Sequence, residues 1–249
     1  MRKFFRSVLQ KVTYLVQLLQ IKLHMSNQII CVLPSTAWAG IVITDNHDPM
    51  VHIEESATIK LGWIQKSYPA SFLIRKSVYE KLTQVAESLP EGMVLVIIEG
   101  FRSFESQKAS FDARYQKLQK ENPSWDNEKV FFETALVIAK PSPLSNHNCG
   151  GAVDVTLGYS DGTLIDMGSP YATGNYTPED RKKFPMFASG LTDEQQNNRK
   201  LLRESMEAAG FIWYPGEWWH YCYGDRMWAV YSGKKECFYG PVELPQNSE

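Results

Sequence analysis

The sequence predicts an α+β fold, a single domain in which a central antiparallel sheet is flanked by helices. Two kinds of pattern alternate along the chain. Some segments repeat apolar residues at helical spacing, whereas others are short apolar runs bounded by glycine or show the period-2 alternation of strands. The chain has 249 residues, which suits one full hydrophobic core.

The first half of the chain contains a clear helix and a clear strand. Apolar residues recur at helical spacing over Ser77–Leu89, and Ser77 with Glu80 forms a capping-box pattern that predicts where this helix begins. Val94–Ile98 is a continuous apolar run, which is typical of a buried central strand. Two shorter apolar runs, at 59–64 and 70–74, predict further strands.

Three further helices are predicted, two before the candidate site residues of the middle of the chain and one after them. Ser103 can cap a helix that follows it, and a second apolar helical stretch covers 130–138. Thr192 with Gln195 forms a capping box for the last clear helix. Residues 158–191 are rich in Gly, Pro, Ser and Thr, and such long irregular segments are often binding loops or lids.

The chain ends flank the predicted domain. We expect residues 1–45 to form an N-terminal extension, 46–240 to form the domain, and 241–249 to form a tail. A basic start and a later apolar stretch before Ala-Trp-Ala imitate a targeting signal, but Pro34 interrupts the stretch. Composition therefore slightly favours a cytoplasmic location over export. Residues 9–23 can form an amphipathic helix, and no stretch reaches the roughly 18 apolar residues of a membrane span.

Charge and cysteine content narrow the function classes. The net charge of −2 gives no basic footprint, so we expect no nucleic-acid partner. The four cysteines form no C-x-x-C pair, and we expect them to be free thiols. Two of them, Cys149 and Cys222, stand beside the candidate metal ligands described next, where a thiolate could compete for the metal.

Three residues carry the strongest chemical signal. His147, Asp154 and His220 offer two imidazoles and a carboxylate, the donors that Zn²⁺ prefers, and three protein ligands leave a fourth position for water. Gly150-Gly151 allows a tight loop between the first two. Period-2 alternation along 152–157 then places Asp154 on the face opposite the valines.

Two further residues can act on a substrate at such a centre. Glu217 would point away from His220 on a regular strand, so we expect it in the turn that Pro215-Gly216 predicts, or on a bulge. From there its carboxylate could serve as a general base for a metal-bound water. Arg102 follows the strand at 94–98, where it could stabilise charge on a carbonyl oxygen or form a surface salt bridge.

The order and spacing of these residues resemble a known family. S-x-H-x-x-G-x-A-x-D over Ser145–Asp154, followed by E-x-W-H over Glu217–His220, is similar to the zinc D,D-peptidases, which include D-alanyl-D-alanine dipeptidases and carboxypeptidases. The form E-W-W-H-Y, residues 198–211 and Met167-Gly168-Ser169 resemble the vancomycin-resistance-type dipeptidases in particular. The resemblance covers 94–223. It implies one zinc ion per chain, with His147, Asp154 and His220 as ligands, Glu217 as the base, Arg102 as the transition-state residue and Ser145 on the substrate backbone.

The resemblance implies hydrolysis of D-alanyl-D-alanine, a small D-amino-acid peptide, in cell-wall metabolism. Two alternatives are a D,D-carboxypeptidase or endopeptidase acting on peptidoglycan stem peptides, and a non-catalytic zinc-stabilised binding module. One departure bears on this choice. Where the dipeptidases place an Asp that holds the substrate ammonium, this chain has Ala172, although Asp161 or Asp166 of the same loop could replace it.

Overall fold

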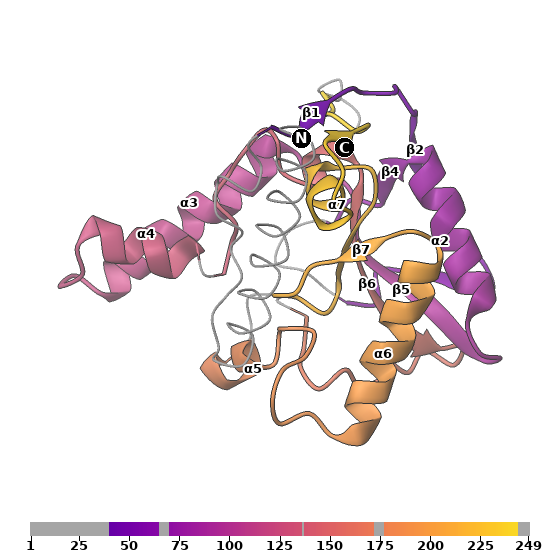
Figure 1. The fold of residues 1–249 in the computed structure, drawn as a ribbon. Helices are drawn as coiled ribbons and strands as arrows, with labels where there is room; N and C mark the ends of the chain where they lie inside the picture. The colour runs from indigo at the N-terminus through magenta and orange to yellow at the C-terminus, as the bar shows by residue number, and fades with distance from the viewer. Residues whose placement is uncertain (1–39, 65–69, 136, 172–176, 244–249) are drawn as a thin grey trace, which may run out of the picture.

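A five-stranded sheet forms the centre of the fold. We use a computed structural model that describes residues 40–64, 70–135, 137–171 and 177–243 (Figure 1). Within them the strand order is β3-β5-β6-β8-β7; β3 and β5 are parallel, and the other neighbours are antiparallel. The predicted α+β fold with a central sheet is confirmed, with the parallel β3–β5 pair as a correction. The strands are β3 (Ile59–Leu61), β5 (Met93–Glu99), β6 (Ala152–Tyr159), β8 (His220–Cys222) and β7 (Ile212–Trp213).

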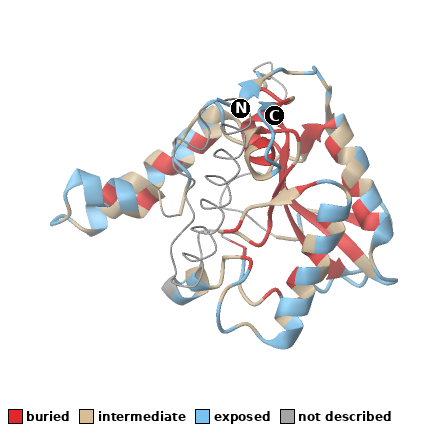
Figure 2. Cartoon of the chain, in the orientation of Figure 1, coloured by how far each residue is buried: buried red, intermediate tan, exposed pale blue. Residues whose placement is uncertain are grey.

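Helices α2 (Lys76–Ser88) and α6 (Asp193–Ala208) cover one face of this sheet (Figure 1). Figure 2 shows buried residues concentrated on the strands and on the inner sides of these helices. Each aliphatic side chain buried there contributes about 1.5–3 kcal/mol, so this core fixes the sheet firmly. The side chains that meet in it include Leu82, Leu202, Met206, Leu95, Ile97, Val153, Val155 and Leu157.

The predicted alternation along β6 is confirmed. Because Val153 and Val155 face the core under α2 and α6, Asp154 faces the other side of the sheet. On that side Ala152 packs in a second cluster with α7 (Arg226–Tyr231). Two small strand pairs complete the fold: β1 (Val42–Ile43) with β9 (Glu236–Cys237), and β2 (Met50–His52) with β4 (Leu73–Arg75). The domain boundary at residue 46 stays a prediction.

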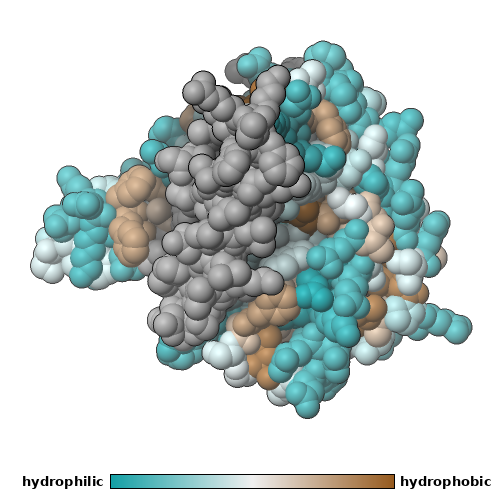
Figure 3. Space-filling view, viewed as in Figure 1, coloured by the Kyte–Doolittle hydropathy of each residue, from teal (hydrophilic) through white to brown (hydrophobic). Residues whose placement is uncertain are grey.

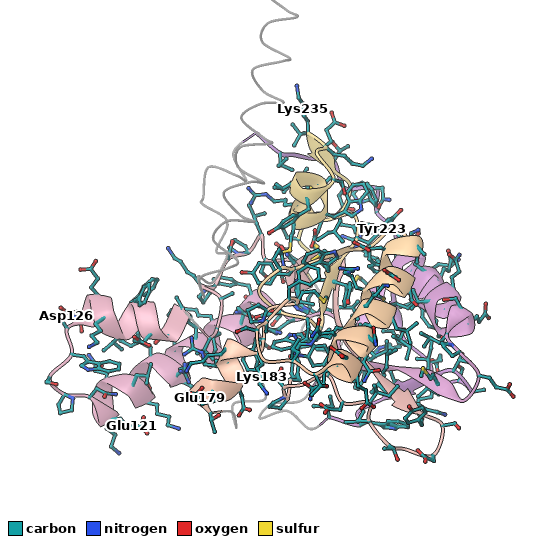
Figure 4. All side chains as sticks on the ribbon, turned by 60° about the horizontal axis from the view of Figure 1, so that its bottom comes forward. Glu121, Asp126, Glu179, Lys183, Tyr223 and Lys235 are labelled. Carbon is teal, nitrogen blue, oxygen red and sulfur yellow. The ribbon has the colours of Figure 1, made fainter. Side chains whose placement is uncertain are left out.

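Helices α3 (Phe104–Glu121) and α4 (Asn127–Ala135) form a hairpin that projects from the body, with Glu121 and Asp126 at its tip (Figure 4). Figure 3 shows an apolar patch on this hairpin, where Phe131 and Phe132 are 40% and 59% exposed. Two side chains of α3 are buried: Gln107, which bonds to Arg102 just after β5, and Phe111, which packs against Phe131 of α4.

The helix starts give both confirmations and one correction. The capping box predicted for Ser77 and Glu80 is wrong, because α2 begins at Lys76 and its N-cap has no side-chain hydrogen bond. Instead Asp48 accepts a hydrogen bond from the Ser77 amide at 3.0 Å, so a carboxylate distant in sequence stabilises the first turn. Two predicted caps are confirmed, Ser103 at α3 and the Thr192–Gln195 box at α6.

The other segment predictions had mixed outcomes. The helix expected over 130–138 is α4, which begins earlier and ends at Ala135. The loop expected over 158–191 contains the short helix α5 (Pro178–Lys182). The helix expected over 9–23 lies outside the described residues. Among the described helices, none combines the length and apolar composition needed to cross a membrane. The three described cysteines are free thiols.

Candidate active site

Strand pairing brings two of the three candidate metal ligands together, and a short 3-10 helix carries the third. In the antiparallel β6–β8 pair, Asp154 lies directly opposite His220. His147 begins a short 3-10 helix, His147–Cys149, which ends at Gly150 with φ of 70°. A side chain at Gly150 would lie 2.6 Å from the Met50 sulfur, so this turn needs glycine for its conformation and for space.

The donor atoms of these residues form a compact triangle. His220 Nδ1 lies 3.0 Å from Asp154 Oδ1 and 3.2 Å from His147 Nε2, and the third side, from His147 Nε2 to Asp154 Oδ1, is 3.5 Å. Ligands at about 2.0–2.1 Å from a tetrahedral zinc lie about 3.3 Å apart. The triangle therefore has the size of one face of a zinc tetrahedron, and the residues fit the metal that the sequence predicted.

The remaining polar atom of each ligand has its own partner. His147 Nδ1 lies 2.7 Å from the Gly100 carbonyl, which requires the proton on Nδ1 and leaves Nε2 free to bind a metal. His220 Nε2 lies 3.2 Å from the Cys222 sulfur. Asp154 Oδ2 accepts a hydrogen bond from the Tyr171 hydroxyl at 2.9 Å. Such contacts orient ligands before the metal arrives.

Two of the three groups in the triangle, Asp154 and His147, favour the protonation state that binds a metal. Burial by itself would raise the pKa of Asp154, but the two histidines hold it well below its usual range. Burial lowers the pKa of His147, which keeps that imidazole neutral. Burial opposes a charge on His220 as well, yet the hydrogen bond and charge of Asp154 raise its pKa overall. An anionic carboxylate beside a neutral imidazole is the state that binds a cation.

Arg102 is directed toward this centre by residues of β5 and α3. Its guanidinium donates to both carboxylate oxygens of Glu99 and to the Gln107 side chain. One guanidinium nitrogen, Nη2, lies 4.0 Å from Asp154 Oδ2. The side chain is 16% exposed, so this is no loose surface salt bridge. Sequence reasoning missed Glu99, whose signal was a lone carboxylate at the end of a buried apolar strand.

Glu217 lies in the turn between β7 and β8, as predicted, because β8 begins only at His220. The aromatic run that begins at Trp218 predicts a strand from that residue, but Trp218 and Trp219 still belong to the turn. Burial raises the pKa of Glu217 to about 7, while the charges of His220 and Arg102 lower it and that of Asp154 raises it. A carboxyl group with a pKa near neutrality, in the field of the metal ligands, has the property of a general base.

Ser145 is two residues before His147 and half-buried. Its hydroxyl makes no hydrogen bond with the part of the chain that the structure describes. It lines a small cavity together with Asn146, Cys149 and Asp225. Its role on the substrate backbone therefore stays a prediction.

Asp161 and Asp166 of the 158–191 loop form hydrogen bonds away from the metal centre. Asp166 accepts hydrogen bonds from the Gly168 amide and the Gln195 side chain, at 2.7 and 2.8 Å, and Asp161 accepts one from the Thr163 amide. Both are exposed. These bonds give no support to either carboxylate as a replacement for the ammonium anchor. Ala172 lies outside the described residues.

Three candidate metal ligands, which leave a fourth position for water, together with an acid–base carboxylate are typical of a hydrolytic metalloenzyme. A comparison with known protein families identifies the class more narrowly. The model of the D-ala-D-ala dipeptidase family, among the M15 peptidases, matches residues 58–239. The chain belongs to this family and is a zinc metallopeptidase. The resemblance inferred from the sequence is confirmed.

Individual relatives carry the same description. A D-alanyl-D-alanine dipeptidase of Synechocystis sp. is 26% identical over 206 residues, which cover 69% of this chain and 80% of the relative. One of Enterococcus faecalis is 31% identical over 135 residues, 52% of this chain and 62% of the relative.

Solved structures are more distant. A mutant of the vancomycin resistance D,D-pentapeptidase VanY, in complex with Zn(II), is 18% identical with a TM-score of 0.40, covering 79% of this chain and 96% of that chain. The LdcB LD-carboxypeptidase is 18% identical with a TM-score of 0.44, covering 80% and 85%.

Proposed function

We propose that this chain is a zinc D,D-dipeptidase that hydrolyses the peptide bond of D-alanyl-D-alanine, with His147, Asp154 and His220 as the metal ligands. The donor triangle, with sides of 3.0–3.5 Å, is the observation that carries the proposal. Membership of the D-ala-D-ala dipeptidase family, and the names of the relatives in Synechocystis and Enterococcus, support the substrate.

Glu217 would move the protons of the reaction. With a pKa of about 7 it can take a proton from the attacking water and return it to the amine that leaves. Zinc, when bound, supplies Lewis-acid chemistry, which lowers the pKa of water to about 7 and polarises a carbonyl group.

Arg102 would stabilise the negative charge that develops on the substrate oxygen. Glu99 and Gln107 hold its guanidinium before the substrate arrives, so little reorganisation remains for the reaction itself. The loss of one such donor typically costs about 10²–10³ in kcat. A zinc-stabilised binding module would need neither Arg102 nor Glu217 in these positions, which argues against that alternative.

One observation favours a second candidate, cleavage of N-acylated D-Ala-D-Ala termini such as those of peptidoglycan stems. A free dipeptide carries an ammonium group, and burying it without an anionic partner is costly. Residues 172–176 contain no acidic side chain. The loop carboxylates that the structure describes have other partners: Asp161 binds Thr163, Asp166 binds Gly168 and Gln195, Glu179 binds Lys182, and Asp180 binds Thr177.

A substrate panel tests the proposal. Purified zinc-loaded protein is incubated with D-Ala-D-Ala, N-acetyl-D-Ala-D-Ala and a stem pentapeptide, and released D-Ala is measured. Glu217→Gln protein, purified in the same way, controls for contaminating peptidases. Release from the free dipeptide supports the dipeptidase, and release from the acylated peptides alone supports the second candidate. No release from any of them, by protein that holds zinc, would refute both.

A further inference from the structure

We propose that Tyr171 is a positioning residue of the metal centre, whose hydroxyl holds the second oxygen of Asp154 so that the carboxylate presents only Oδ1 to the metal. The inference rests on the zinc ligation proposed above. It assigns a role to the 158–191 loop, which the sequence marked as a binding loop without saying what it does.

The two oxygens of Asp154 face different partners. Oδ1 lies 3.0 Å from His220 Nδ1 and 3.5 Å from His147 Nε2, at a corner of the donor triangle. Oδ2 accepts the hydrogen bond of the Tyr171 hydroxyl at 2.9 Å. Tyr171 is 6% exposed, and its ring packs edge-on against Trp219 at 5.1 Å between centroids. The hydroxyl therefore has a fixed place, and it divides the carboxylate into a ligand atom and a held atom.

This division matters for the open position of the metal. A carboxylate can bind a cation through one oxygen or through both. Binding through both would fill space that a catalytic site keeps for water or substrate. Oδ2 also lies 4.0 Å from Arg102 Nη2, so an Asp154 released by Tyr171 could draw this guanidinium away from the substrate. Tyr171 thus protects both the ligand geometry and the oxyanion-binding residue.

Arg199 of α6 explains why Tyr171, a loop residue, is held in place. Arg199 is 2% exposed, and its guanidinium donates to backbone carbonyls on both sides of the loop segment that carries Tyr171. Its Nε binds the Met167 carbonyl at 2.6 Å, and its two terminal nitrogens bind those of Pro185 and Lys183 at 2.7 Å each. One buried cation therefore joins the start of the segment to its end. In Figure 4 Lys183 marks this end, beside α5.

A second contact links the loop to the turn that carries Glu217. The indole nitrogen of Trp218, the next residue, donates to Ser169 Oγ at 2.9 Å. The Arg199 guanidinium lies over the Trp218 ring at 5.6 Å. Ser169 is two residues before Tyr171, so the hydroxyl on Asp154 and the proposed base are positioned by one connected set of contacts.

Tyr171→Phe tests the inference, because it removes the hydroxyl and keeps the ring against Trp219. Zinc affinity is measured by competition with a chromophoric chelator, and ligand geometry by the visible absorption of the Co²⁺-substituted protein. We expect zinc to bind about 10- to 100-fold more weakly, the usual effect of losing a partner of a metal ligand. The Co²⁺ bands should change as well. A loss of less than tenfold, or unchanged Co²⁺ bands, would overturn the inference.

Tyr239→Phe is the matched control. Tyr239 is 1% exposed and also donates its hydroxyl to a carboxylate, Asp48 Oδ2, at 2.8 Å, but neither residue belongs to the metal centre. The control should bind zinc as the wild type does. An equal loss of zinc affinity in Tyr239→Phe would mean that the loss in Tyr171→Phe comes from general destabilisation, and it would overturn the role of Tyr171.

Two non-natural residues keep the test decisive if Tyr171→Phe does not fold. 4-Aminophenylalanine in place of Tyr171 retains a hydrogen-bond donor, whereas 4-fluorophenylalanine has similar size but none. The first should restore zinc affinity and the second should not; equal affinities would contradict the inference. A wild-type chain that binds no zinc would instead refute the proposed function, which separates the two failures.

Discussion

Asp225→Asn should make this protein more stable at neutral pH, because Asp225 is a carboxylate in an unfavourable place. It is 1% exposed, and burial raises its pKa from 3.8 to about 6. Oδ1 caps α7 by accepting from the Trp228 amide at 2.7 Å; this bond, the Cys222 thiol and the charge of His220 lower the pKa, but burial outweighs them. Asparagine keeps the cap and removes the charge.

The sign follows from the order of the two titrations. As pH rises, the unfolded chain loses the Asp225 proton near 3.8 and the folded chain only near 6, so the unfolding free energy falls between these values. The full loss is about 3 kcal/mol at 1.36 kcal/mol per pKa unit. About 1.4 kcal/mol of it falls between pH 5 and 7.5. The Asn variant lacks this loss, whatever fixed cost its amide carries.

Urea unfolding of chelator-treated protein at pH 5 and pH 7.5 measures the effect. The stability of Asp225→Asn relative to wild type should rise by about 1.4 kcal/mol between the two pH values. Asp126 gives a matched control, because it caps α4 through the Lys129 amide but is exposed. Asp126→Asn should change stability by less than about 0.5 kcal/mol at either pH. A relative stability of Asp225→Asn that does not vary with pH would refute the reasoning.

Three further predictions concern the site. His147→Ala should lower bound zinc from one ion per chain to none, measured by elemental analysis, because two ligands remain; retained metal would remove His147 from the ligand set. Glu217→Gln should keep its zinc but lower kcat by about 10²–10⁴, because an amide accepts no proton, and a near-normal kcat would identify another base. Ala172→Asp should raise kcat/KM for free D-Ala-D-Ala relative to its N-acetyl form by about ten- to a hundredfold, from a charge-assisted hydrogen bond of roughly 1.5–3 kcal/mol. An unchanged ratio would place the ammonium group away from residue 172.

Sequence reasoning succeeded where local periodicity decides the geometry. Alternation along β6 was enough to turn Asp154 away from the core, because the neighbouring valines must be buried. The turn at Pro215-Gly216 was enough to place Glu217 outside the strand. In both cases the residues that set the geometry are adjacent in the chain, so their effect can be inferred without knowing the fold.

Sequence reasoning failed where a residue distant in the chain supplies a hydrogen bond. Ser77 and Glu80 have the pattern of a capping box, yet Asp48 supplies the contact at the start of α2 from 29 residues away. The contact of Tyr171 with Asp154 has no local signature either, because it depends on how the loop after β6 returns to that strand. It is a hydrogen bond between buried polar groups, which only the assembled fold can bring together.

The way Arg199 anchors its loop has a consequence for how this enzyme can change. Its partners at Met167, Lys183 and Pro185 are main-chain carbonyls, and every amino acid carries one. Substitutions in the segment between these points leave the anchor chemically intact. Apart from Ser169 and Tyr171, whose side chains make specific contacts, the segment can thus diversify in sequence while the metal ligands stay in place. Exchanging residues 172–182 between relatives, with the metal ligands and Glu217 unchanged, would test whether this segment sets the substrate preference.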